Sequence, residues 1–94
     1  MKLKWLEDAI DDLQSLRQYI AQNNPKAANQ IAKKILSTIN LLSEQPEIGR
    51  QGRVHNTREL VISETSYIAP YRVKNGVIEI LRILHSSMEW PEEI

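Results

Sequence analysis

Four residues in the last forty or so positions have side chains suited to act on an anionic substrate or partner. Arg58, Arg72 and Arg82 each stand among apolar residues in a segment that predicts a β-strand, and His85 closes the last of these segments. Arginine suits planar, bidentate contacts with phosphate or carboxylate groups, and histidine can act as a general acid or base near neutral pH. These residues are therefore candidates for a catalytic site or for a partner-binding surface.

Each candidate also has an ordinary structural explanation. An arginine on a mostly apolar strand must reach the rim of the sheet or pair with an acid, so Arg72 could pair with Glu59 or Glu79. A single histidine is more often a hydrogen-bonded polar residue than a catalyst, and His55 has no directly neighbouring acid. Residues 49–88 hold six basic and three acidic side chains, which also suits a solvated sheet face.

The composition excludes several classes of site. The chain has 94 residues, enough for one domain with a modest core. It has no cysteine, which excludes disulfides, iron–sulfur clusters and a thiol nucleophile and favours a reducing cytoplasm. The two histidines lack metal-ligand spacing and no glycine-rich phosphate loop is present, so we expect neither a metal nor a cofactor. Short apolar runs and the lack of a signal peptide predict no contact with a membrane.

The first half of the chain predicts a short strand at Met1–Trp5 followed by two helices. Apolar residues recur every three or four positions, as on one face of a helix, at Leu6, Ala9, Ile10, Leu13, Leu16 and Ile20. A second stripe contains Ala28, Ile31, Ala32, Ile35, Ile39 and Leu42. Asn24 is a good N-cap and Pro25 suits the first helical position, so the second helix begins there and ends before Pro46. The short connection predicts an antiparallel helical hairpin.

The second half predicts a loop at Glu47–Thr57 and then strands at Arg58–Ser63, Tyr67–Lys74 and Val77–His85. Asn75-Gly76 between two apolar runs is a strong hairpin signal. Pro70 cannot donate to a strand ladder, which implies a bulge or a stretch without a partner. The order β-α-α-β-β-β predicts one α+β domain over residues 1–94, with both helices on one face of a small antiparallel sheet.

Alternation along each strand assigns side chains to the two faces of the sheet. In the last predicted strand, Arg82 falls on the same face as Ile80 and Leu84, and His85 falls on the opposite face. Each of the three strands therefore carries one arginine among apolar neighbours.

A series of short motifs runs through the chain in a fixed order. In the first half they are Trp5 before an acidic helix, Tyr19-Ile20, Asn24-Pro25-x-Ala27-Ala28 and Leu42-x-x-x-Pro46-x-x-Gly49-Arg50. In the second half they are Thr57-Arg58-Glu59-Leu60-Val61, Tyr67-Ile68-x-x-Tyr71-Arg72-Val73, Ile80-Leu81-Arg82-Ile83-Leu84-His85 and Trp90-Pro91. With this order and spacing, the chain resembles toxins of the RelE/ParE superfamily over essentially its whole length, and it is closer to the ParE-like branch.

The resemblance implies an α+β toxin of a type II toxin–antitoxin system. A cognate antitoxin, ParD-like or another small DNA-binding protein, would neutralise it in a hetero-oligomer, and DNA would be contacted only through that antitoxin. RelE-like members cut mRNA in the ribosomal A site, whereas ParE-like members poison DNA gyrase. The resemblance also implies residues that bind the target or partner, namely Arg50, Arg58, Tyr71, Arg72, Arg82, His85 and Trp90. In an RNase, the catalytic residues would be Arg58, Arg72, Arg82 and His85.

Two features of the chain favour the ParE-like activity. Met88 stands where the family usually has an arginine three residues after the histidine, and the acids Glu89, Glu92 and Glu93 would repel RNA. Docking on a ribosome favours a strongly basic protein, whereas this chain has zero net charge and a pI near 6.7. We therefore expect a gyrase inhibitor that is not an enzyme. The alternatives are a metal-independent RNase of the RelE type and, because of Met88, a weakly toxic member that mainly binds its antitoxin.

Overall fold

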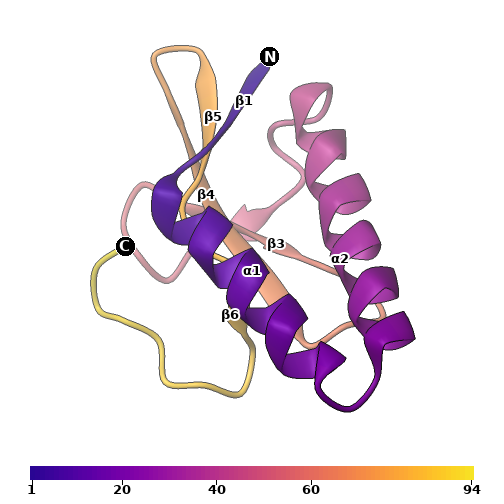
Figure 1. Cartoon of the computed structure of the whole chain (residues 1–94). Coiled ribbons are helices and arrows are strands. Elements are labelled where there is room, and N and C mark those ends of the chain that lie inside the picture. Colours follow the sequence, from indigo (N-terminus) through magenta and orange to yellow (C-terminus); the bar gives the residue numbers. More distant parts are fainter.

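The computed structural model describes residues 1–94 and shows two layers (Figure 1). Two antiparallel helices form one layer and cover one face of a six-stranded sheet. The predicted α+β class is therefore confirmed.

The helical layer consists of α1 (Glu7–Ala21), α2 (Pro25–Asn40) and a 3₁₀ turn, η1 (Leu41–Ser43). Asn24 Oδ1 accepts a hydrogen bond of 3.0 Å from the N–H of Ala27, and Pro25 is the first helical residue. Both predicted start signals of α2 are thus confirmed, because each satisfies or removes an amide donor that has no partner within the helix. Neither helix is long and apolar enough to cross a lipid bilayer.

The sheet is mixed rather than wholly antiparallel. Its strands are β1 (Lys2–Trp5), β2 (Arg50–Gln51), β3 (Arg58–Val61), β4 (Tyr67–Lys74), β5 (Val77–Ile80) and β6 (Leu84–His85). They lie in the order β1-β5-β4-β3-β2, and β6 also pairs with β4. β1 runs parallel to β5, and the other pairs are antiparallel. The expectation of an antiparallel sheet is corrected at β1, because a helical hairpin, unlike a tight turn, allows a parallel return. β2 lies within the predicted loop.

The last predicted strand is interrupted at residues 81–83. β5 ends at Ile80 and β6 begins at Leu84. Between them, the N–H of Leu81 donates a hydrogen bond of 2.9 Å to the carbonyl of Pro70. The regular ladder on this side of β4 stops at Tyr71, so Pro70 lies in a stretch without a ladder partner on that side, which is one of the two predicted alternatives. The interruption also shifts the alternation. Leu84 pairs with Ile68, so the prediction that Ile80 and Leu84 share a face is wrong.

The predicted turn joins β4 to β5. Asn75 and Gly76 have φ values of 53° and 76°, and the flanking Lys74 and Val77 pair directly. A two-residue hairpin turn of type I′ needs positive φ at both positions, which Asn and Gly adopt at low cost. This turn fixes the β4–β5 register.

The main core lies between the helices and the sheet. Its fully buried side chains include Ile35, Ile39, Leu42, Ile62, Tyr71, Ile78 and Ile80. Side chains that alternate with these along the strands point to the opposite face of the sheet, here called the outer face. Four buried apolar residues lie there, namely Ile68, Pro70, Leu81 and Leu84.

Candidate functional site

Glu59 on β3 is the centre of a charged cluster on the outer face. Its side chain is only 3% exposed. Oε1 accepts hydrogen bonds of 3.1 and 2.9 Å from Nε and Nη2 of Arg50. Oε2 accepts hydrogen bonds of 2.9 Å from the backbone N–H of Arg53 and 3.1 Å from its Nε. One buried carboxylate therefore holds two guanidinium groups on side chains that remain 53% and 50% exposed.

The pairing of β2 with β3 explains this arrangement. Arg50 lies directly opposite Glu59 in the register, and Arg53 follows three residues later. Burial raises the pKa of Glu59, but hydrogen bonds from the Arg53 backbone and from both guanidinium groups lower it by more. As a result, the pKa of Glu59 lies below the ordinary value of 4.5, so the carboxylate is ionised at neutral pH.

The C-terminal tail completes this cluster. The guanidinium carbon of Arg53 lies 3.6 Å from the centroid of the Trp90 ring, which is a cation–π contact. Trp90 Nε1 in turn donates a hydrogen bond of 3.2 Å to the backbone carbonyl of His85. Arg53 thus contacts Glu59 through its N–H groups and Trp90 through its flat face.

Arg72 and Glu79 form a second ion pair on the outer face. They lie opposite each other in the β4–β5 register, and Arg72 Nε donates a hydrogen bond of 2.7 Å to Glu79 Oε1. This is one of the two pairings that the sequence allowed for Arg72. The hydrogen bond from Arg72 lowers the pKa of Glu79. Because the Arg72 side chain remains 36% exposed, part of its guanidinium still faces solvent.

Arg82 turns away from this face towards the helical layer. It forms an ion pair with Asp12 of α1, with 2.7 Å between Nε and Oδ2. The interruption between β5 and β6 frees Arg82 from the strand ladder. Its ion pair with Asp12 places Arg82 on the helix side of the sheet, the side of the core residue Ile80, as the alternation predicted. Arg82 is therefore engaged in holding α1 to the sheet.

Arg58 and Tyr71 fix the loop that precedes β2. Tyr71 is fully buried. Its hydroxyl donates a hydrogen bond of 2.8 Å to the carbonyl of Pro46 and accepts one of 2.9 Å from the N–H of Gly49. Arg58 Nη1 donates a hydrogen bond of 2.9 Å to the carbonyl of Gly49. A Cβ atom at Gly49 would lie 2.5 Å from the Tyr71 ring, so a larger residue would force the ring to move. Tyr71 belongs to the core and has no exposed surface for a partner.

His85 is partly exposed at the end of β6. Its ring meets the Tyr67 ring edge-on, with 5.3 Å between centroids. Its Nδ1 accepts a hydrogen bond of 3.1 Å from the N–H of Ser87 and lies 2.7 Å from the Ser87 hydroxyl. No arginine or carboxylate forms a hydrogen bond with the ring, so neither group is in place to assist proton transfer there.

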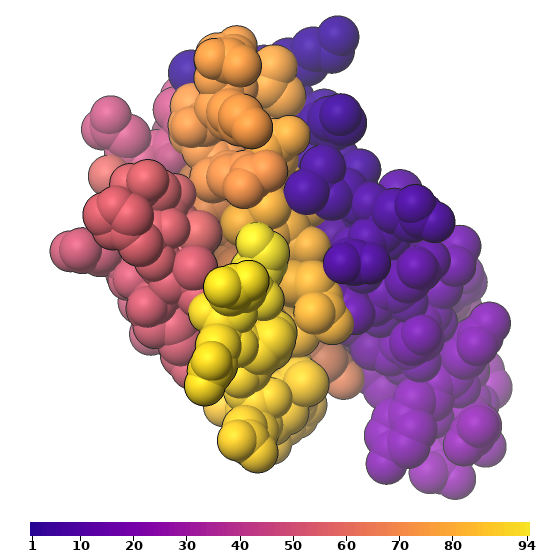
Figure 2. Space-filling view, turned by 90° about the vertical axis from the view of Figure 1, so that its left-hand side faces the viewer, coloured from indigo at the N-terminus to yellow at the C-terminus, as the bar shows by residue number.

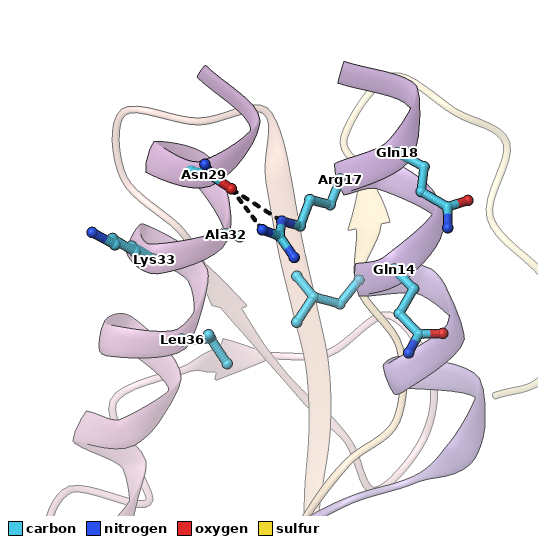
Figure 3. Close-up of a pocket in the computed structure, with 8 residues that line it drawn as sticks. Gln14, Arg17, Gln18, Asn29, Ala32, Lys33 and Leu36 are labelled. Carbon is cyan, nitrogen blue, oxygen red and sulfur yellow. Dashed lines mark hydrogen bonds between the residues drawn. The ribbon is translucent and has the colours of Figure 1, made fainter. Parts of the chain in front are cut away.

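A groove of about 760 Å³ lies between the two helices (Figure 3). Leu13, Ala32 and Leu36 supply its apolar lining, and the polar lining comes from Gln14, Arg17, Gln18, Asn29 and Lys33. Figure 3 shows Arg17 reaching across to Asn29, whose Oδ1 accepts hydrogen bonds of 3.2 and 2.7 Å from Nε and Nη2. Arg17 and Lys33 are the charged residues of the groove, which therefore offers positive charge beside apolar surface.

The structure does not bring the predicted site residues together in one place. Arg50, Arg72 and Trp90 lie at the outer face, whereas Tyr71 and Arg82 serve the core and the helix–sheet contact. Arg58 supports the loop before β2, and His85 lies at the end of β6. Two central members of the cluster, Arg53 and Glu59, were not predicted as site residues, and neither were the residues of the groove. No group of three His, Asp or Glu side chains is placed to hold a metal ion.

Comparison with known proteins gives a consistent family. The family described as "ParE toxin of type II toxin-antitoxin system, parDE" matches residues 3–90. Y4kP of Sinorhizobium fredii is 36% identical over 91 residues, which is 97% of this chain and 94% of that protein. Toxin RelE2 of Caulobacter vibrioides is 36% identical over 83 residues, covering 88% of this chain and 92% of the relative.

A solved structure agrees with these sequence relatives. A chain from the chromosomal ParDE TA system from P. aeruginosa superposes with a TM-score of 0.84 at 30% sequence identity. The match covers 90% of this chain and 95% of that one. The similarity therefore extends through the helical hairpin and the sheet alike.

Proposed function

Because the chain belongs to the ParE toxin family of type II toxin–antitoxin systems, we propose that it arrests growth by poisoning DNA gyrase in the cytoplasm. A cognate antitoxin, ParD-like or another small DNA-binding protein, neutralises it by forming a hetero-oligomer. In this proposal the chain is an inhibitor that acts by binding and is not an enzyme.

The ion pairs of two of the three strand arginines carry the choice of a protein target. RNA cleavage without a metal needs a base, an acid and a cation that stabilises the charge developing on the phosphate. Arg72 and Arg82 are each paired with a carboxylate, and a guanidinium so neutralised is a poor stabiliser of further negative charge. His85 has no charged partner to tune it as acid or base.

The charge of the whole chain supports the same choice. Twelve basic residues are balanced by twelve acidic ones, and two of those acids, Glu59 and Glu79, lie on the outer face beside the exposed arginines. Binding to ribosomal RNA depends mainly on cations that contact phosphates. A protein partner imposes no such need for excess positive charge.

The names of two relatives favour a second candidate function. RelE2 and RelE3 of Caulobacter vibrioides, 36% and 35% identical to this chain, are named as RelE toxins. The second candidate is therefore a ribosome-dependent mRNA endonuclease of the RelE type. A weakly toxic chain that mainly binds its antitoxin is the third, supported by Met88 at the position of the family's usual arginine.

Parallel assays of the purified chain separate these candidates. We expect ATP-dependent supercoiling by gyrase to be inhibited, with cleaved DNA accumulating, while mRNA on translating ribosomes stays intact. When it is expressed in cells, the variant His85→Gln should arrest growth as the wild type does. Cleavage of mRNA in the A site with normal supercoiling would instead establish the RNase, and neither effect at full expression would establish the weakly toxic alternative.

The groove between the helices suits the antitoxin. Its apolar residues Leu13 and Leu36 would receive the apolar face of an antitoxin helix, and Arg17 and Lys33 would receive acidic side chains. Charge reversal by Arg17→Glu should therefore weaken capture of the co-expressed antitoxin at least tenfold, whereas Lys26→Glu, on the same hairpin but outside the groove lining, should leave it within twofold. Equal capture by both variants would place the antitoxin elsewhere.

A further inference from the structure

Three lysines and an arginine gather at the end of the sheet that carries the β4–β5 turn. β1, β5 and β4 lie side by side there, and their registers align two rows of residues across the three strands. One row is Lys2–Val77–Lys74 and the next is Lys4–Glu79–Arg72. The four basic residues Lys2, Lys4, Arg72 and Lys74 are here called the basic patch, and Glu79 is the acid within it.

Alternation along the strands places the basic patch on the outer face. On β1, Leu3 and Trp5 pack against the main core, so the two lysines that alternate with them point away from it. Tyr71 on β4 and Ile78 on β5 belong to the core and fix the alternation there in the same way. Figure 2 shows the C-terminal tail, in yellow, below the β4–β5 hairpin, in orange. The tail therefore leaves this part of the outer face open, and all three lysines are exposed.

Most of the positive charge of the patch has no counter-charge. Glu79 forms its ion pair with Arg72 and is only 15% exposed, whereas none of the three lysines forms an ion pair. The hydrogen bond from Arg72 is the main cause of the lowered pKa of Glu79, and the charges of Lys74 and Lys4 lower it further. Both ammonium groups thus lie near one recessed carboxylate that is already paired, and they remain free to meet an anionic partner.

The spacing of the patch suits a regular array of anions. Residues two positions apart on one strand lie about 7 Å apart, and residues separated by one intervening strand lie about 10 Å apart. Lys2 and Lys4 have the first spacing, and Lys4 and Arg72 have the second. Duplex DNA carries one phosphate charge for about every 1.7 Å of its axis, so a duplex lying on this face can bring phosphates to several of these cations at once.

We propose that the basic patch binds the phosphate backbone of double-stranded DNA without reading its sequence. The patch has no aromatic side chain on which an unstacked base could lie, whereas proteins that bind single strands or RNA loops commonly supply one. Its one apolar residue, Val77, is half-buried, whereas the centre of a protein–protein interface is apolar and often aromatic. Contacts between ammonium groups and phosphates need neither feature.

This direct contact differs from the expectation that DNA is reached only through the antitoxin. Binding of DNA by the free chain is independent of the proposed function, but its use rests on that function, because an inhibitor held by gyrase lies close to the DNA that gyrase acts on. Non-specific contacts of this kind give dissociation constants of about 10⁻⁴–10⁻⁶ M. The patch therefore strengthens a complex that protein contacts hold, and it does not replace those contacts.

Fluorescence anisotropy of a short fluorescein-labelled DNA duplex at low salt tests the contact. The full-length wild type is compared with two triple variants that lose the same charge. The patch variant carries Lys2→Gln, Lys4→Gln and Lys74→Gln. The control variant carries Lys26→Gln, Lys33→Gln and Lys34→Gln, which are the three remaining lysines and all lie on α2. We expect the patch variant to bind the duplex at least tenfold more weakly than the wild type, and the control variant to stay within threefold.

The dependence of binding on salt counts the contacts. With four phosphate contacts, the logarithm of the wild-type binding constant should fall against the logarithm of the salt concentration with a slope of about −3.6. Loss of three contacts should reduce the size of this slope by about 2.7. Circular dichroism confirms that each protein is folded. Equal weakening in the two variants, or no binding by the wild type at low salt, would overturn the proposal.

Two competitors and one gyrase assay complete the test. Tighter binding of poly-glutamate than of the duplex would overturn the proposal in favour of an acidic protein partner, and tighter binding of single-stranded RNA would overturn it in favour of RNA. In the supercoiling assay, the patch variant should need at least fivefold more protein than the control variant for half inhibition, and equal amounts would overturn the use of the patch on gyrase. A wild type that binds the duplex but leaves supercoiling intact would contradict the proposed function and support the DNA contact.

Discussion

Arg82 and Asp12 lie 70 positions apart in the chain, and their side chains form a two-point contact. Arg82 Nε and Nη2 donate hydrogen bonds of 2.7 and 3.0 Å to the two carboxylate oxygens of Asp12. The Oδ2 atom of Asp12 also accepts a hydrogen bond of 3.0 Å from the backbone N–H of Ile83. The hydrogen bonds that Arg82 donates to Asp12 raise the pKa of Arg82. A single carboxylate on α1 therefore satisfies the polar groups that the interruption between β5 and β6 leaves outside the ladder.

Removing this carboxylate should destabilise the fold. Asp12→Ala leaves the guanidinium of Arg82 and the N–H of Ile83 without their partner, so we expect the free energy of unfolding to fall by about 2–3 kcal/mol. Urea denaturation followed by circular dichroism measures the change. Asp11→Ala, the neighbouring exposed acid of the same helix, should change stability by at most about 0.5 kcal/mol. Equal effects of the two variants would show that the two-point contact contributes little.

Local signals in the sequence were sufficient for much of the fold. Asn24-Pro25 and Asn75-Gly76 determine the backbone at their own positions, so the start of α2 and the β4–β5 turn could be predicted. The direction of β1 could not be, because Lys2 pairs with Val77 only after the helical hairpin has packed against the sheet. The interruption after Ile80 was signalled by Pro70, but the resulting change of face was not.

The same distinction explains what the sequence revealed of the candidate site. A two-residue turn fixes the register of β4 and β5, so Glu79 could be named among the partners of Arg72. The partners of Arg82 and Arg53 could not be predicted, because Asp12 and Trp90 reach them only through tertiary packing. A missed signal for Glu59 was its position between Leu60 and Arg58 on a strand, where a buried acid needs cations nearby.

The Tyr71 hydroxyl should contribute to stability through the loop before β2. Tyr71→Phe leaves the N–H of Gly49 and the carbonyl of Pro46 without their partner, and both lie close to the core. We expect a loss of about 1–3 kcal/mol in the free energy of unfolding, measured by urea denaturation. The matched control is Tyr19→Phe, since Tyr19 is 72% exposed and should tolerate the change. A loss no greater than that of the control would contradict the assigned role.

Glu59 should make stability depend on pH in the acid range. Its folded pKa lies below the ordinary value of 4.5, so its contribution is full above about pH 4.5 and is lost as the pH falls through the folded pKa. At pH 7, Glu59→Gln should cost about 2 kcal/mol. The difference between wild type and variant should shrink as the pH is lowered from 5 to 3.

Urea denaturation at several pH values tests this dependence. Glu79 has a lowered pKa as well, but it is present in both proteins, so its contribution cancels in the difference. Glu44→Gln, at an exposed acid without an ion pair, should give a difference that is small at every pH. A gap between wild type and Glu59→Gln that is constant or widens on acidification would show that the two arginines do not favour the ionised carboxylate.

Exchange of the charges of Arg72 and Glu79 separates pairing from contact with a target. Each single variant, Arg72→Glu or Glu79→Arg, places like charges opposite each other and should lower the free energy of unfolding modestly, because Arg72 is partly exposed. The double variant restores the cross-strand pair and should recover most of that stability. If the exposed part of Arg72 contacts the target, as the family resemblance implies, both variants that carry Arg72→Glu should lose growth arrest at equal expression, whereas Glu79→Arg should retain it. Recovery of growth arrest in the double variant would show that Arg72 acts only through its ion pair.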